Sequence, residues 1–227
     1  ADMPVQETDN TFFTFDTVAP ANNIPYAKNQ HRCRQFARKW GVNLFDVNFG
    51  IGTHTLIEKG IVRPGMTAIG TDSHYNILGA IGAFGQGTGD VDTAFVWKTG
   101  KLWFEVPKSA KVVLKGIPQN PLVTPKDIAL KLLMEFGASG LLGYSVELYG
   151  DYIDNLDLDG RITIASQGTE MGMISLMIPP NDKLMSELPK PYYAENPDMV
   201  YADQDANYDG NYEIDITDLE PLLAAPF

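Results

Sequence analysis

The sequence predicts an α/β protein arranged as two lobes. Strand-like and helix-like segments alternate along the chain, which is the pattern of parallel strands covered by helices. The composition changes near Pro107, and this change predicts one lobe over residues 1–107 and a second α/β lobe over residues 108–227 that ends in an acidic C-terminal extension. The chain has 227 residues, of which 44% are hydrophobic, so it can bury a core without disulfides or metals.

Short apolar segments separated by turn residues define the first lobe. In order, we expect a strand over 11–18 that ends at Ala19-Pro20, a helix over 26–40, a strand over 42–48, a glycine-rich turn over 50–54, an apolar approach over 62–69, and a closely packed helix from 77 that gives way to a loop by 89. Gly41 follows the helix over 26–40 as a C-cap residue, which fixes where that helix ends.

The second lobe begins with a clear strand, because apolar and polar residues alternate over 109–117. Thr124 and Pro125 then form a helix start, and an amphipathic run continues from there to Met134 or Phe136. Two further strands are expected over 144–149 and 161–166. From residue 179 onward the chain is rich in Pro, Asp, Asn and Tyr and contains few long apolar runs.

Charge and hydropathy exclude several classes of function. The net charge is −12 with only 17 basic residues, which argues against binding to nucleic acid and against attraction to anionic membranes. No window reaches the roughly 18 apolar residues that a membrane span requires. The first ten residues have neither a basic nor an apolar segment of the kind found in an intact signal peptide, so a cytoplasmic location is expected.

The most informative polar group is Asp72-Ser73-His74, with His54 in the glycine-rich turn that precedes it. An aspartate can hold an imidazole in one tautomer, and a serine can orient a carboxylate. A hydrogen-bonded loop would contain the same residue types. A Ser-His-Asp hydrolase is disfavoured, because adjacent residues on a strand point to opposite faces and no G-x-S-x-G motif occurs.

Two other motifs were tested as ligand sites. The glycines over 85–89 lack the Gly-Lys-Ser/Thr ending of a phosphate-binding loop, so helix packing and capping explain them better. The residues from Asp205 to Gly210 match the first six positions of an EF-hand loop, and Glu213 could add an oxygen. Position twelve is Ile216, however, where a bidentate Glu is required, so a solvated acidic loop is the simpler interpretation.

The run over 50–107 resembles the aconitase superfamily, and within it the N-terminal and middle portion of the large subunits of 3-isopropylmalate dehydratase and homoaconitase. The resemblance continues through 111–116, 124–133, 157–172 and 201–227. It implies a three-layer α/β/α fold and a hydro-lyase of amino-acid biosynthesis that dehydrates and rehydrates a hydroxy-polycarboxylate. By this resemblance the catalytic residues are Asp16, His54, Asp72, Ser73, His74 and Glu170.

Several positions depart from the family pattern. Thr17 stands where an active-site His is usual, Thr55 stands where Gln is usual, and Ala165 replaces a Cys. The family binds a [4Fe-4S] cluster, whose Cys ligands come from motifs C-terminal to the matched portion. Cys33 is the single cysteine here and matches none of them. Because such a cluster needs about three thiolates, we expect no cofactor to be held by this chain alone.

Two hypotheses follow from this combination. In the first, the chain is a truncated hydro-lyase part that needs a C-terminal half or a small subunit on another chain. In the second, it is a non-catalytic aconitase-like module that binds a carboxylate metabolite or a protein partner. Exposed apolar surface where missing domains would dock predicts partner binding or homo-oligomers under either hypothesis.

Overall fold

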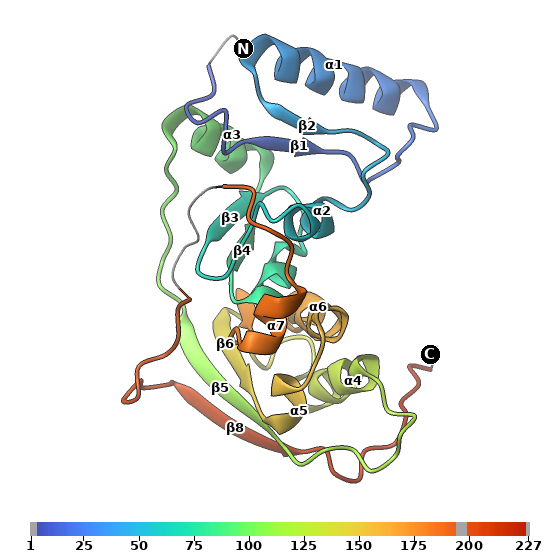
Figure 1. The fold of residues 1–227 in the computed structure, drawn as a ribbon, viewed down its shortest axis with the longest axis vertical. Coiled ribbons are helices and arrows are strands. Elements are labelled where there is room, and N and C mark those ends of the chain that lie inside the picture. Colours follow the sequence, from blue (N-terminus) through green and yellow to red (C-terminus); the bar gives the residue numbers. More distant parts are fainter. Residues whose placement is uncertain (1–3, 194–198, 226–227) are drawn as a thin grey trace.

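The computed structural model describes residues 4–193 and 199–225 of the chain. The molecule is elongated, and three parallel sheets follow one another along its long axis (Figure 1). Helices alternate with the strands throughout, so the predicted α/β class is confirmed. The division into lobes at residue 107 remains a prediction.

The first sheet pairs two three-residue strands, β1 (Phe12–Thr14) and β2 (Asn43–Phe45), which run parallel. They are joined by α1 (Ile24–Trp40), which lies beside them at one end of the molecule (Figure 1). The Asn23 side chain accepts a hydrogen bond from the Tyr26 amide at the start of α1, and Gly41 ends the helix with a φ of 72°. The predicted helix and its cap are therefore confirmed, whereas both flanking strands are shorter than expected.

The structure around the second sheet differs from the sequence-based prediction at two segments. Its strands are β3 (Thr67–Gly70) and β4 (Phe84–Gly87), and around them lie α2 (Gly52–Glu58), the 3₁₀ helix η1 (Tyr75–Ile81) and α3 (Asp90–Thr99). The expected turn over 50–54 is the beginning of α2. The expected loop near Gly85 is the strand β4, which pairs in parallel with β3. Gly85 has room for no side chain, because a Cβ there would lie 1.9 Å from the Tyr75 carbonyl oxygen.

The third sheet has the strand order β7-β6-β5-β8, and all its neighbours are parallel. Its strands are β5 (Lys108–Lys115), β6 (Tyr144–Tyr149), β7 (Ser175–Met177) and β8 (Gly210–Asp215). The helical elements of this part are α4 (Pro125–Phe136), α5 (Asp151–Asp154), α6 (Leu158–Ala165), the 3₁₀ helix η2 (Ser166–Met171) and α7 (Asp182–Glu187). The predictions of β5, α4 and β6 are confirmed.

The expected strand over 161–166 is wrong, because this segment lies in α6 and the start of η2. The Asp157 side chain accepts a hydrogen bond from the Gly160 amide, so the helix begins at Leu158, four residues before the β-branched run. A local cap therefore outweighs the strand preference of Ile162 to Ile164. Within the acidic C-terminal extension, Gly210–Asp215 forms β8 at the edge of the third sheet, a strand that the sequence analysis did not identify.

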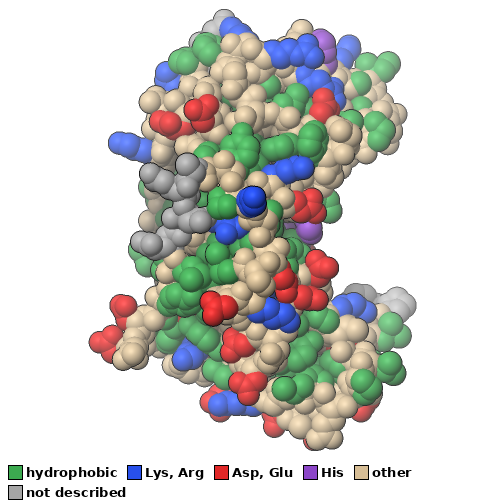
Figure 2. Space-filling model, viewed as in Figure 1, with side chains coloured by type: hydrophobic (Ala, Val, Ile, Leu, Met, Phe, Trp, Pro, Cys, Tyr) green, Lys and Arg blue, Asp and Glu red, His purple; other side chains and the backbone are tan. Residues whose placement is uncertain are grey.

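Three clusters of buried apolar residues support these sheets. The largest lies under the third sheet, the second surrounds η1 and α2, and a small cluster of Val5, Ala37 and Val42 lies beside α1. The second cluster includes Leu184 and Leu188 from the region of α7, so segments far apart in the sequence share it. Figure 2 shows Lys and Arg side chains over α1 and Asp and Glu side chains spread over the opposite end. In the described part of the chain, no helix has the length and apolar character needed to cross a membrane.

Candidate active site

The Asp72-Ser73-His74 turn directly follows the end of β3, and its own hydrogen bonds hold it in place. The Asp72 carboxylate accepts a hydrogen bond from the His74 backbone amide at 2.8 Å. The Ser73 hydroxyl lies 3.0 Å from His74 Nδ1. Because Asp72 holds the turn together, Ser73 and His74 are presented in one fixed arrangement after the end of β3.

Glu170 reaches His74 from a helix 96 positions further along the chain. His74 Nε2 lies 3.1 Å from Glu170 Oε1. The neighbouring Thr169 hydroxyl lies 3.0 Å from the Ser73 carbonyl oxygen and 2.9 Å from Asn76 Oδ1, and its single proton is available to either acceptor. A carboxylate only accepts hydrogen bonds, so Nε2 carries a proton, and in the neutral ring Nδ1 accepts from Ser73. The sequence-predicted group of Asp72, Ser73, His74 and Glu170 is thus brought together.

Asp16 belongs to a different element, the loop that follows β1. Its Oδ2 accepts a hydrogen bond from the Gly52 amide at 2.8 Å, and its Oδ1 accepts from the Thr17 hydroxyl at 3.3 Å. The first of these bonds fixes Asp16 against the start of α2. Gly52 allows this approach, because a Cβ there would lie 3.3 Å from Asp16 Oδ2 and 2.3 Å from the Thr14 hydroxyl oxygen.

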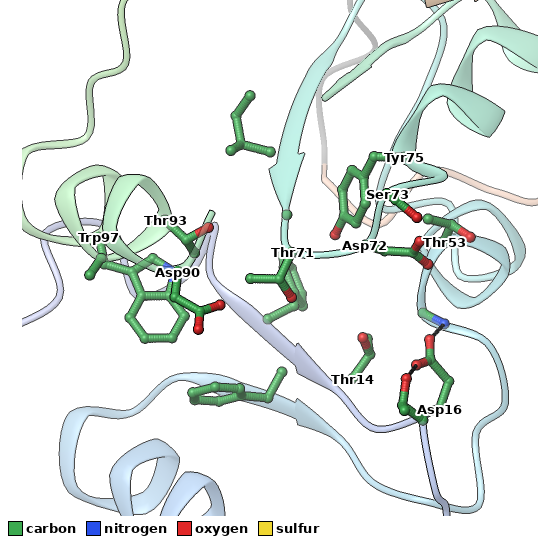
Figure 3. Close-up of a pocket in the computed structure, with 17 residues that line it drawn as sticks. Thr14, Asp16, Thr53, Thr71, Asp72, Ser73, Tyr75, Asp90, Thr93 and Trp97 are labelled. Carbon is green, nitrogen blue, oxygen red and sulfur yellow. Dashed lines mark hydrogen bonds between the residues drawn. The ribbon is translucent and has the colours of Figure 1, made fainter. Parts of the chain in front are cut away.

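These two groups meet at a cavity of about 570 Å³ (Figure 3). The lining residues are Phe12, Phe13, Thr14, Asp16, Thr17, Gly52, Thr53, Ile69, Gly70, Thr71, Asp72, Ser73, Tyr75, Asp90, Thr93, Ala94 and Trp97. Three carboxylates and a set of hydroxyls supply its polar surface, and no Lys, Arg or His is found among the described residues that line it. The cavity therefore accepts and donates hydrogen bonds but attracts no anion by charge.

Tyr75 is the lining residue that the sequence analysis missed most clearly. Burial raises its pKa to about 12, and the charges of Asp72 and Asp16 add to this effect. The phenol therefore stays protonated at neutral pH. Its ring occupies space that only glycine leaves free, because a Cβ on Gly70 would lie 2.1 Å from the ring. Two features of the sequence could have identified Tyr75 as a site residue. It is a large side chain with a hydroxyl directly after His74, and Gly70 stands five positions before it.

His54 stands apart from this arrangement. It lies within α2, next to Thr53, and it is not among the residues that line the cavity. Its Nδ1 atom is buried and has no hydrogen-bond partner in the described residues. The structure thus places Asp16, Asp72 and Ser73 on the cavity, and His74 and Glu170 beside it, whereas His54 lies behind its wall.

The residues present do not fit an iron–sulfur cluster. Cys33 lies on α1 and is half-buried, and burial raises the pKa of its thiol, which opposes the thiolate form that binds metal. No group of three or more His, Cys, Asp or Glu residues within 4–193 and 199–225 could hold a metal ion. In the acidic loop, Asp209 instead bonds the start of β5, because its Oδ2 accepts from the Ser109 amide at 3.1 Å.

Comparisons with known proteins show which family the sequence matches. A family model described as the aconitase family (aconitate hydratase) matches residues 2–227. The probable methanogen homoaconitase large subunit of Methanothermobacter thermautotrophicus is 38% identical over 98% of this chain and 52% of its own length. The 3-isopropylmalate dehydratase large subunit 1 of Methanopyrus kandleri is 37% identical over 94% of this chain and 51% of its own length. The homoaconitase large subunit of Thermus thermophilus is 36% identical over 93% of this chain and 49% of its own length. The chain therefore spans about half the length of the curated relatives it matches.

Proposed function

The chain belongs to the aconitase family, and from that premise we propose that it supplies the acid–base part of a hydro-lyase. Its substrate is a hydroxy-polycarboxylate of the kind named by its relatives, which are homoaconitases and isopropylmalate dehydratases. The observation that carries the proposal is the hydrogen-bonded set of Ser73, His74 and Glu170 beside the cavity that Asp16 and Asp72 also reach.

Loss of water from a hydroxy acid needs a proton for the departing hydroxyl, and the reverse reaction needs that proton to be taken back. His74 suits this role, because Glu170 stabilises its protonated ring from one side while Ser73 connects its other nitrogen to the cavity. Asp16 and Asp72 accept hydrogen bonds and so orient the alcohol group. Thr17, which stands where the family has a histidine, offers a hydroxyl to Asp16 and cannot itself donate a proton as an acid.

The cavity also indicates what this chain needs from elsewhere. A polycarboxylate carries at least two negative charges, and the lining supplies three carboxylates and no cation among the described residues. The cationic groups that bind the substrate carboxylates, and the thiolates for a [4Fe-4S] cluster, therefore come from outside the 227 residues described by this sequence. The half of the relatives' length that this chain does not match, or a small subunit, is the natural source.

The second candidate is a non-catalytic module that binds a carboxylate metabolite or a protein partner. Thr17 and Ala165 favour it, because they replace a histidine and a cysteine of the family pattern. The acidic cavity disfavours the metabolite version, because Asp16, Asp72 and Asp90 would repel a dicarboxylate. Binding of malate to the isolated chain at micromolar concentration would support this candidate over the hydro-lyase.

Reconstitution tests the proposal. The chain is expressed anaerobically with polypeptides that carry the cysteine-bearing half and the small subunit, and dehydration of isopropylmalate or homocitrate is followed by the absorbance of the unsaturated product. We expect turnover that falls at least about 100-fold in His74→Ala, because a positioned acid contributes about 10²–10⁴-fold. His31→Ala is the matched control, since His31 is exposed on α1. A reconstituted enzyme that is inactive, or equally active with His74→Ala, contradicts the proposal.

A further inference from the structure

The helix α1 concentrates positive charge at one end of an acidic chain (Figure 2). It contributes five of the 17 Lys and Arg residues and contains no Asp or Glu. The rest of the chain therefore has 12 Lys and Arg residues against 29 Asp and Glu, which is a net charge of −17. A local positive field of this kind attracts an acidic surface even though the whole chain is negative.

Helical spacing gathers the exposed side chains of α1 on one face. Gln30 and Ala37 are buried on the opposite face. Phe36 and Trp40 pack there against the small apolar cluster beside the first sheet. The polar residues that recur at intervals of three and four therefore form a stripe on the side of α1 away from the protein. The exposed residues of this stripe are Lys28, His31, Arg32, Gln35, Arg38 and Lys39.

Three of these positive charges are not paired within the part of the chain that the structure describes. Arg34, at the edge of the stripe, pairs with Asp46. Lys28, Arg32 and Arg38 form no ion pair with another described residue. Their field reaches about 8 Å into physiological salt, so it guides the approach of a negatively charged partner and fixes its register.

A shallow hollow in the same face adds an apolar element. It has a volume of about 470 Å³ and lies over the first half of α1. Ile24, which is 70% exposed, and Ala27 supply its apolar lining. Lys28 and Arg32 line it beside them. An apolar side chain flanked by carboxylates would fill the hollow and meet both cations at once.

The charges also decide which occupant fits this face. Two copies of α1 placed face to face would bring like charges together, which costs free energy. A contact between α1 and the acidic end of another copy would be heterologous and would continue into an open chain of molecules. A nucleic acid would be repelled by the rest of the chain, and its phosphates would leave the apolar part of the hollow empty. A different polypeptide with an acidic and partly apolar segment meets none of these objections.

We propose that the outer face of α1 is a docking surface for an acidic segment of another polypeptide. An apolar side chain of that segment lies in the hollow at Ile24, and its carboxylates bind Arg32 and Arg38. The inference does not rest on the proposed function, because no residue of α1, all of which the structure describes, lines the cavity.

Three anionic probes test this surface. The purified chain is titrated with a fluorescent peptide of repeated Leu-Glu-Glu-Leu units, with an oligothymidylate of equal charge and with phosphatidylserine vesicles. We expect the peptide to bind most tightly and to shift the NMR signals of α1. Arg32→Glu/Arg38→Glu should weaken peptide binding about tenfold, because two attractions become repulsions at the surface. Lys101→Glu/Lys126→Glu, which changes the net charge equally at exposed positions elsewhere, is the matched control and should change the affinity less than about twofold.

Ile24→Ser separates the hollow from the charges. It should weaken peptide binding about threefold, because less apolar surface is buried, and leave any binding of oligothymidylate unchanged. Circular dichroism establishes that each variant folds, and Lys28→Gln/Arg32→Gln replaces the double reversal if that variant does not fold. No peptide binding, tighter binding of either other probe, or equal affinities in the double reversal and its control would overturn the proposal. Self-association of the wild type that is lost in Arg32→Glu/Arg38→Glu would also overturn it, in favour of a second copy.

Discussion

The cavity has two walls that are built in different ways. The Asp72 wall consists of Ile69–Ser73 and Tyr75, and the core around η1 and α2 supports it, with every residue from Asn76 to Ile81 buried. The Asp16 wall consists of Phe12–Thr14, Asp16 and Thr17, and the small cluster of Val5, Ala37 and Val42 lies behind it. The Asp72 wall has the larger apolar cluster behind it, whereas the Asp16 wall has the smaller one, against which the partly buried rings of Phe13 and Trp97 pack. The same kind of substitution should therefore have unequal effects on the two walls.

Two side chains of α1 reach the loop around Asp16, in addition to the hydrogen bond that Asp16 accepts from the Gly52 amide of α2. Gln30 donates a hydrogen bond to the Val18 carbonyl oxygen at 3.2 Å, and Arg34 lies 5.1 Å from the centre of the Phe15 ring while it pairs with Asp46. The loop that carries Asp16 is therefore positioned by a helix rather than by a buried sheet. This difference predicts that the Asp16 wall tolerates substitution better and responds more to pH.

The largest loss of stability is expected on substitution of Gly79, which lies in η1 behind the Asp72 wall. A Cβ there would lie 2.0 Å from the Leu176 carbonyl oxygen, which is backbone and cannot move cheaply. Gly79→Ala should lower the free energy of unfolding by about 3 kcal/mol or more, which is a fall in melting temperature of roughly 6–12 °C. Gly89→Ala is the control, because its nearest neighbour would be 3.7 Å away. Calorimetry showing equal melting temperatures for the two variants would mean that η1 does not pack closely against β7.

A smaller difference is expected when buried apolar side chains are truncated behind each wall. Leu78 is 0% exposed and Val42 is 6% exposed. Leu78→Ala should cost about 3–4 kcal/mol, whereas Val42→Ala should cost about 1–2 kcal/mol because it removes less volume from a smaller cluster. Urea unfolding of both variants measures this difference. A larger loss for Val42→Ala would reverse the ranking of the two walls.

The smallest expected effect is a change in stability with pH, and it concerns the ion pair between Arg34 and Asp46. The Arg34 side chain is the main cause that lowers the pKa of Asp46 to about 2, below the value near 3.9 expected in the unfolded chain. The ion pair therefore stabilises the fold fully above about pH 4, and this stability is lost as the pH falls toward 2. Because both side chains are partly exposed, the contribution is at most about 1 kcal/mol. Asp46→Asn should remove it at pH 7 and change little at pH 2. Urea unfolding at both pH values checks this, and an equal loss at both would exclude the ion pair as the cause.

The sequence predicted the local features better than the distant ones. The caps at Gly41 and Thr124 identified two helices because capping depends on neighbouring residues. The strand β4 was missed, because Gly85 is required by the close approach of the Tyr75 backbone and Gly87 by that of the Asp72 backbone, which no local pattern reveals. The turn at Asp72 was predicted from its motif. The contact of His74 with Glu170 joins residues 96 positions apart. The family resemblance named both residues but did not predict that they meet.

Packing between distant elements also explains why the structure places His54 and Tyr75 differently from the sequence-based expectation. The sequence predicts His54 in a turn that faces the site. In the structure α2 begins at Gly52 and includes His54, and Thr53 lines the cavity instead. Tyr75 was not proposed, because a tyrosine after His74 has no local signature of burial. Both positions depend on how α2 and η1 pack together, and that packing is set by the second apolar cluster.

The ionisation of Tyr75 tests most directly whether the two walls face one cavity, since burial and then the charges of Asp72 and Asp16 hold its pKa at about 12. NMR of chains with ¹³C-labelled tyrosine rings follows this titration in the wild type, Asp16→Asn and Asp72→Asn, with exposed Tyr201 as an internal reference. We predict that Tyr75 remains un-ionised at pH 10.5, where exposed tyrosines are largely ionised, and that each substitution lowers its pKa. Ionisation of Tyr75 at pH 10.5, or a Tyr75 pKa unchanged by Asp16→Asn, would contradict the account.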